Sequence, residues 1–223
     1  MNSKLQEILD ELSSVLSGKT IDAILPPIVY VIVNAIFGLL PAVIAAILMG
    51  LLLGVFRIAK GQKWVYALGG LLAVGVAAGL ALLTQNAASY FIPAMVSSGL
   101  LLLGAVITNL VGKPLAAWTS HLTRSWPLDW YWRKDVLPAY REVTWIWGLF
   151  FAMRLAVQYT LFSQGQAATL GWANTLLGWP VTILVLVLSY IYGIWRLRKL
   201  GGPGVEEFES GSQPPWQGQT RGF

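Results

Sequence analysis

The chain has 223 residues, of which 56% are hydrophobic and only 11% are charged, and its mean hydropathy is +0.64. Soluble domains usually carry about a quarter charged residues, so this composition excludes a soluble enzyme, a disordered chain and a nucleic-acid-binding domain. The net charge of +5 is small in a chain with so few charges, and we interpret it as a membrane-topology signal.

The first expected element is an amphipathic helix within residues 1–19. Apolar residues recur at helical spacing from Leu5 to Leu16, and acidic and amide side chains take the opposite face. We expect this cytoplasmic helix either to lie at the membrane interface and pack on the bundle, or to dock a partner.

Six apolar runs in the membrane domain, residues 20–199, are long enough to cross a bilayer as helices. They contain no apolar–polar alternation, which argues against strands. The predicted spans are residues 21–40, 41–56, 64–83, 91–111, 144–162 and 172–195. The predicted fold class is therefore an all-α, polytopic transmembrane helical bundle.

Every Lys and Arg except Arg154 lies outside these spans, in the two terminal regions, in the 57–63 connection or in the 113–141 region. The other connections carry no charge of either sign. The positive-inside rule therefore predicts that both termini are cytoplasmic, in a multi-pass protein of a bacterial inner membrane.

The connection 113–143 is the long inner loop. It combines basic residues with tryptophans, which is typical of a segment at the level of the lipid headgroups, and we expect an interfacial helix there. The expected interfacial anchors are Trp118, Trp126, Trp130 and Trp132. The tail, residues 200–223, is rich in Gly, Pro, Ser and Gln and is predicted to be disordered unless a partner holds it.

Arg154 is the residue that calls for an explanation, because it lies about ten residues into the fifth span, about 15 Å deep. A central Arg costs at least about 2.5–3.5 kcal/mol to insert, so it must face the bundle or a wet cavity. Gln158 follows one turn later, Trp147 precedes on the same stripe, and Asn34 lies at a similar depth to Gln158 in the first span.

Two interpretations of Arg154 remain open. In the first, Arg154 donates to Asn34, Gln158, tyrosines and free carbonyls, and locks the packing of the bundle. In the second, its guanidinium awaits an anion such as a lipid phosphate or a carboxylate. The candidate ligand-binding residues are Arg154, Gln158, Asn34 and Trp147.

Catalytic patterns are missing from the sequence. Cysteine is absent and a single histidine is present, so neither a nucleophile–base pair within the membrane nor a metal cluster is expected. No Gly-rich phosphate loop is found, and no carboxylate lies in any span to relay protons. We expect no enzyme activity, no catalytic residue, no metal and no cofactor.

Several stretches carry a family resemblance: Leu25–Asn34, Trp132–Asp135 leading to Ala139–Arg141, Phe150–Arg154 continuing through Gln158 to Leu161, and Gly178–Pro180. This pattern resembles a bacterial integral-membrane family of unknown function, mostly actinobacterial, and is distantly similar to the intracellular septation protein A group. The resemblance covers about residues 20–199. It implies a membrane architecture and brings no mechanism.

The leading hypothesis is a non-enzymatic inner-membrane protein whose bundle binds or carries a lipid or amphiphile near Arg154. The alternative is an accessory structural subunit of a larger membrane complex, such as an energy-transducing or photosynthetic assembly. The expected partners are membrane lipids and possible protein subunits of such a complex, and not nucleic acid.

Overall fold

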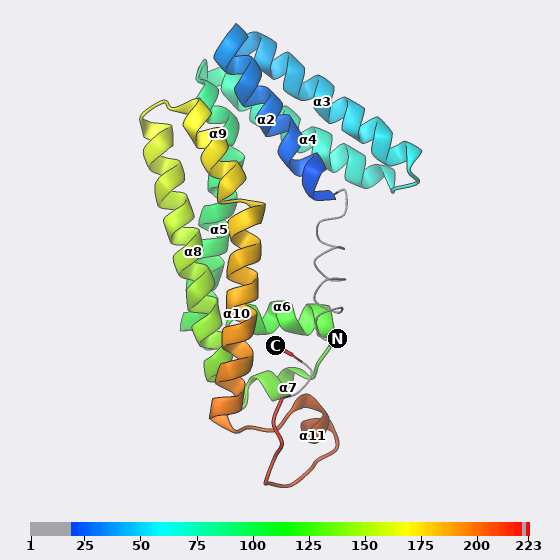
Figure 1. Cartoon of the computed structure of the whole chain (residues 1–223), viewed down its shortest axis with the longest axis vertical. Coiled ribbons are helices and arrows are strands. Elements are labelled where there is room, and N and C mark those ends of the chain that lie inside the picture. Colours follow the sequence, from blue (N-terminus) through cyan, green and yellow to red (C-terminus); the bar gives the residue numbers. More distant parts are fainter. Residues whose placement is uncertain (1–18, 220–221) are drawn as a thin grey trace, which may run out of the picture. The chain divides into compact units, whose positions relative to one another are not determined.

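The computed structural model describes residues 19–219 and 222–223, so the amphipathic helix predicted within residues 1–19 lies almost wholly outside the described residues. Every regular element in the described part is helical. In chain order the elements are α2 (Lys19–Phe37), α3 (Leu39–Ala59), α4 (Trp64–Thr84), the 3-10 helix η1 (Ala87–Phe91), α5 (Ile92–Leu110), α6 (Leu115–Arg124), α7 (Leu128–Tyr131), α8 (Leu137–Ser163), α9 (Ala167–Leu176), α10 (Trp179–Leu200) and α11 (Val205–Glu209) (Figure 1).

The predicted helical bundle is confirmed. Among the described residues, five helical segments are long and apolar enough to cross a membrane: Leu39–Ala59, Ala67–Thr84, Ala87–Leu110, Leu137–Ser163 and Ala167–Leu200. A shorter apolar helix, Leu25–Phe37, corresponds to the first predicted span. These helices indicate a polytopic membrane protein.

The first two predicted spans meet three residues earlier than expected. Helix α2 ends at Phe37 and α3 begins at Leu39, so the turn is made at Gly38 rather than around Leu40 and Pro41. Gly38 has a φ of 84°, a conformation that side-chain-bearing residues rarely adopt. The turn therefore forms where the backbone permits it.

The sixth predicted span, residues 172–195, lies within the apolar segment Ala167–Leu200, and this segment is made of two helices rather than one. The chain is helical in α9 up to Leu176 and again in α10 from Trp179, and the break falls at Leu177 and Gly178. Pro180 lies in the first turn of α10, where the missing N–H of proline has no helical partner to lose. Proline thus begins a new helix here.

The chain divides into two compact units, and the first comprises residues 1–96 and 157–179. Within it, α2, α3 and α4 lie side by side (Figure 1). Its core includes a stack of Tyr30 on Tyr90, with ring centroids 3.9 Å apart, and Phe91 against both rings. The Tyr30 hydroxyl donates to the Ala87 carbonyl at 3.0 Å, which satisfies this buried polar group.

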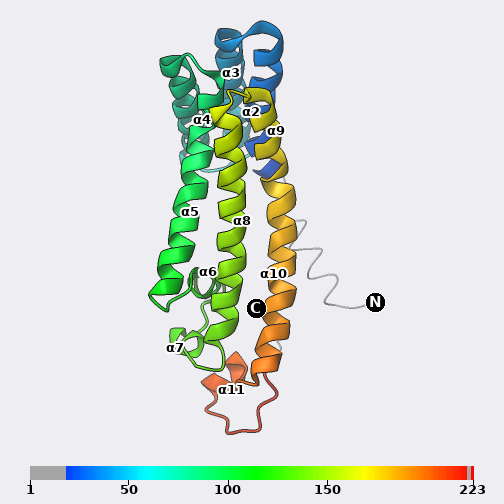
Figure 2. The same ribbon diagram turned by 90° about the vertical axis from the view of Figure 1, so that its left-hand side faces the viewer.

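The second unit comprises residues 97–156 and 180–223. Its parts of α5, α8 and α10 run side by side (Figure 2). Asn109 of α5 donates from Nδ2 to the Arg141 carbonyl of α8 at 3.1 Å. On its other side, α8 holds α10 through Glu142, whose carboxylate accepts two hydrogen bonds from the Arg196 guanidinium at 2.8 and 2.9 Å. Helix α8 is therefore the central element of this unit.

The disorder predicted for residues 200–223 is wrong over the described part of this tail. Residues 205–209 form α11, and the Trp130 indole donates from Nε1 to the Pro203 carbonyl at 2.9 Å. Arg133 lies over the rings of Phe208 and Trp216. The tail is held by the inner loop of its own chain, a contact that its Gly- and Pro-rich composition does not reveal.

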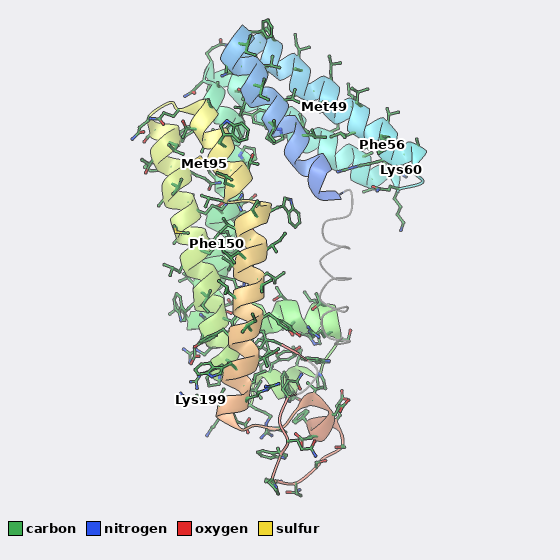
Figure 3. The ribbon with its side chains drawn as sticks, viewed as in Figure 1. Met49, Phe56, Lys60, Met95, Phe150 and Lys199 are labelled. Atoms are coloured by element: carbon green, nitrogen blue, oxygen red, sulfur yellow. The ribbon has the colours of Figure 1, made fainter. Side chains whose placement is uncertain are left out.

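Large apolar side chains remain exposed along the helices, for example Leu52 and Val55 of α3, Leu72 of α4 and Leu149 of α8. Side chains point outward along α3 in Figure 3, which labels Phe56 and Lys60 at its end. The Lys60 ammonium lies 4.3 Å from the centroid of the Phe56 ring. Exposed apolar helices with cations at their ends are typical of membrane proteins.

Candidate functional site

Arg154 lies within α8, in the second unit, and is half-buried. Its Nε atom is buried and has no hydrogen-bond partner among the described residues. No carboxylate in that part of the chain forms an ion pair with it; ion pairs found there include Arg133 with Asp135 and Arg196 with Glu142. A guanidinium carries five N–H donors. At least the Nε–H of Arg154 therefore lacks an acceptor in this apolar helix.

Aromatic side chains precede Arg154 on the same helix. The rings of Trp147, Phe150 and Phe151 contact one another with centroids between 5.4 and 5.9 Å apart. Figure 3 labels Phe150, which is buried. Residues 147, 151 and 154 are separated by four and three positions, so they share one face of α8. The face therefore combines an apolar aromatic surface with one cation.

Trp147 is fixed by the neighbouring helix, because its indole Nε1 donates to the Ser189 hydroxyl of α10 at 3.2 Å. Ser189 is 3% exposed and was not among the residues predicted from sequence. Its spacing of 42 residues from Trp147 left no local signal that could have paired the two.

Gln158 and Asn34 belong to the first unit, whereas Arg154 and Trp147 belong to the second. The Gln158 side chain is fully buried, and its Nε2 donates to Asn174 Oδ1 of α9 at 2.6 Å. Asn174 in turn donates to the Leu170 carbonyl at 2.9 Å. Gln158 Oε1 has no hydrogen-bond partner among the described residues.

The structure brings Gln158 together with Asn174, not with the half-buried Asn34. Sequence reasoning missed Asn174, although an amide within an apolar helix is a signal that could have identified it. In the packing interpretation, Arg154 donates hydrogen bonds to neighbouring side chains and carbonyls. Its buried Nε donates none within the described residues.

The expected interfacial tryptophans differ in burial. Trp118, Trp126 and Trp132 are half-buried, and their rings pack in an aromatic cluster with Tyr131 and Trp130. Trp130 is 0% exposed. Its assignment as an interfacial anchor is wrong, because a fully enclosed indole cannot reach the headgroups. Its N–H binds the tail instead.

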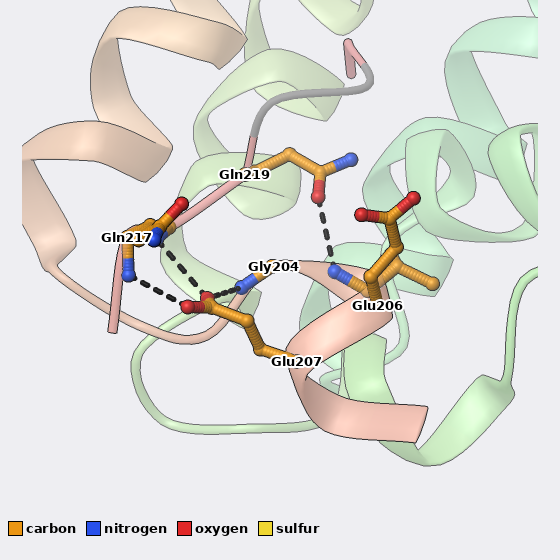
Figure 4. A pocket seen from close by; sticks show the side chains of 7 residues that line it. Gly204, Glu206, Glu207, Gln217 and Gln219 are labelled. Carbon is orange, nitrogen blue, oxygen red and sulfur yellow. Dashed lines mark hydrogen bonds between the residues drawn. The ribbon is translucent and has the colours of Figure 1, made fainter. Parts of the chain in front are cut away.

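A pocket lies in the tail, where it is lined by Gly204–Glu207 and Gln217–Gln219 (Figure 4). The Glu207 carboxylate accepts backbone N–H bonds from Gln217 at 2.7 Å, from Gly204 at 2.8 Å and from Gly218 at 3.1 Å. These backbone donors hold the pKa of the Glu207 carboxyl below its ordinary value, and the Gln217 N–H has the largest effect. These three hydrogen bonds, which we call the Glu207 clasp, join the two segments that line the pocket.

Metal ligands do not gather anywhere in the described part of the chain: it contains no group of three or more His, Asp or Glu side chains that could hold an ion. The absence of a cofactor and of enzyme activity stays a prediction.

The candidate site is the Arg154 face of α8, formed by Trp147, Phe151 and Arg154.

Comparison with known proteins gives one match. The model of a family described as a protein of unknown function, DUF3159, matches residues 17–198. The expected resemblance to a family of unknown function is confirmed, whereas the actinobacterial assignment and the similarity to septation protein A stay predictions. No curated protein and no solved structure matches the chain.

Proposed function

Because the chain belongs to the DUF3159 family of proteins of unknown function, which supplies no activity, we propose a function from its own residues. The protein is a non-enzymatic membrane protein that binds an anionic amphiphile at the Arg154 face of α8. Lipids are its partners in this proposal.

The observation that carries the proposal is the buried, unpartnered Nε of Arg154. Leaving a buried donor unsatisfied costs about 1–3 kcal/mol, and more for a charged group. An anion at the guanidinium would recover this free energy through charge-assisted hydrogen bonds. Phosphate and carboxylate groups suit it best, since the planar guanidinium presents paired donors to them.

The aromatic part of the face supports an amphiphile over a small ion. Trp147, which is half-buried, lies on the same stripe as Arg154; its indole is fixed by Ser189 and backed by the buried ring of Phe151. A rigid aromatic surface of this kind packs against a hydrocarbon chain at little cost in conformational entropy. The headgroup would then bind Arg154 while the chain packs on the Trp147 indole.

The proposal includes the location and orientation of the protein. Basic residues in the 57–63 connection and in the 113–141 region favour the cytoplasmic side of a bacterial inner membrane for these segments. Both termini are cytoplasmic in this arrangement. Cysteine is absent from the chain and His121 is its single histidine, which supports a binding role over catalysis.

Native mass spectrometry after gentle detergent extraction tests this function. The wild-type protein should carry a bound phospholipid or fatty acid, and Arg154→Gln should lose it without losing expression. Arg141→Gln is the matched control, because Arg141 is an exposed arginine on the same helix. Equal occupancy in the wild type and Arg154→Gln would overturn the proposal, as would isolation in a large assembly with stoichiometric protein subunits and no lipid.

A further inference from the structure

The aromatic ring of Phe223 is inserted between α8 and α10. It stacks on Tyr140 of α8 with ring centroids 4.3 Å apart and an interplanar angle of 14°. On the α10 side it lies against Gly193, where an added Cβ would overlap the ring itself. Only glycine leaves room for this contact, so Gly193 and Tyr140 form a notch shaped for a flat ring.

Tyr140 of the notch and the residues of the candidate site share one face of α8, and we call the line along which this face meets α10 the seam. On α8, residues 140, 147, 151 and 154 are separated by seven, four and three positions, which places them on one stripe. On α10, Ser189 lies four positions before Gly193 and thus one turn away on the same face. The Trp147–Ser189 hydrogen bond joins these two faces. Phe223 therefore occupies the end of the seam that contains Trp147.

The contact that holds the Phe223 ring is apolar, whereas other parts of the tail are also fixed by hydrogen bonds. Trp130 donates to the Pro203 carbonyl, and Gln219 Oε1 accepts from the Val205 N–H at 3.0 Å. A stacked aromatic pair is worth about 0.5–1.5 kcal/mol beyond its buried area. An apolar group of similar width can replace such a ring without leaving a polar group unsatisfied.

We infer that the Tyr140–Gly193 notch is a binding subsite for an apolar chain, that Phe223 fills it as a removable plug, and that an anionic amphiphile takes its place with the headgroup toward Arg154. The tail remains attached through its other contacts when the ring leaves. This inference rests on the proposed function, which assigns the headgroup to Arg154.

The plug is tested without any ligand by the reactivity of a buried thiol. The chain contains no cysteine, so Ser189→Cys introduces the single thiol, and sulfur remains a weak acceptor for the Trp147 N–H. In mild maltoside detergent, N-ethylmaleimide should label this thiol slowly. Adding Phe223→Ala should accelerate labelling about tenfold, because the end of the seam is then open.

Two further variants complete this test. Gly193→Ala should accelerate labelling similarly, because its methyl group takes the position of the ring. Phe208→Ala is the matched control: its ring lies in the tail near Arg133 and outside the seam, so the labelling rate should not change. Equal rates in Phe223→Ala and Phe208→Ala would overturn the plug. A thiol at Val143, which is buried on α8, repeats the comparison without altering the Trp147 bond.

Protection of the same thiol by dodecyl phosphate separates the plug from the proposed function. In the Phe223→Ala background, dodecyl phosphate should slow labelling, and Arg154→Gln should abolish this protection. Faster labelling without protection would support the plug and contradict the anion site. Protection that depends on Arg154 but no acceleration by Phe223→Ala would support the anion site and overturn the plug.

Discussion

Trp147 of α8 donates its indole N–H to the hydroxyl of Ser189 on α10, and Ser189 is 3% exposed. We predict that Ser189→Ala destabilises the protein by about 1 kcal/mol, because the indole donor loses its acceptor in an apolar seam. Chemical unfolding in mixed micelles measures this change. Ser163→Ala, at an exposed serine that bonds within its own helix, is the control and should leave stability unchanged. Equal stability of both variants would contradict the role assigned to the bond.

The amide pair of Gln158 and Asn174 predicts that a double variant is more stable than one of its single variants. Asn174→Leu should destabilise the protein by about 1–3 kcal/mol, because it leaves the fully buried Gln158 side chain without its partner. The double variant with Gln158→Leu should recover most of that loss, since both polar groups are then removed. Thr175→Val removes only a bond within α9 and serves as the control. A double variant less stable than Asn174→Leu would show that Gln158 has another essential partner.

The tail contact of Trp130 predicts a local effect. Trp130→Phe removes the donor to the Pro203 carbonyl and part of a fully buried side chain, so the tail should open more often. Hydrogen exchange should then accelerate at the amides of Gly204 and Val205. Trp145→Phe, at an exposed tryptophan of α8, is the control. Unchanged exchange in Trp130→Phe would mean that the indole does not hold the tail.

The Glu207 clasp predicts how the tail responds to acid. Its backbone donors lower the pKa of the Glu207 carboxyl in the folded tail, so the clasp contributes stability above the ordinary glutamate pKa of about 4.3 and loses it as the pH falls through the lower, folded value. The Gln217 and Gly218 amides should therefore be protected from hydrogen exchange at neutral pH and lose this protection, measured against the intrinsic exchange rate at each pH, below about pH 4. Glu207→Gln should remove this pH dependence. An identical acid response in Glu207→Gln would assign the transition to another group.

The spans were predictable because a helix that crosses lipid needs a long apolar run, and such runs are visible residue by residue. Arg154 was identifiable for the same reason, as a charge inside one of them. The break between α9 and α10 also has a local signal, since Gly178 and Pro180 favour a helix end and a helix start. The predicted span, residues 172–195, contains this break.

The remaining features depend on pairs that are distant in the sequence. Trp130 and Pro203 are 73 residues apart, and Gln158 and Asn174 are 16 apart. Composition indicated disorder for the tail because it counts the apolar residues of the tail alone, whereas Phe208, Trp216 and Phe223 pack on residues of the inner loop and α8. The burial of Trp130 follows from the same packing, which no local pattern reveals.

The central claim, an anion site at Arg154, is tested most directly by thermal unfolding with two probes that differ only in their headgroup. Ligand present at 100 times its dissociation constant stabilises a protein by about 2.7 kcal/mol. Dodecyl phosphate should therefore raise the unfolding temperature of the wild-type protein in maltoside micelles, while dodecanol should not, and Arg154→Gln should respond to neither. An equal increase with dodecyl phosphate in the wild type and in Arg154→Gln would contradict the account.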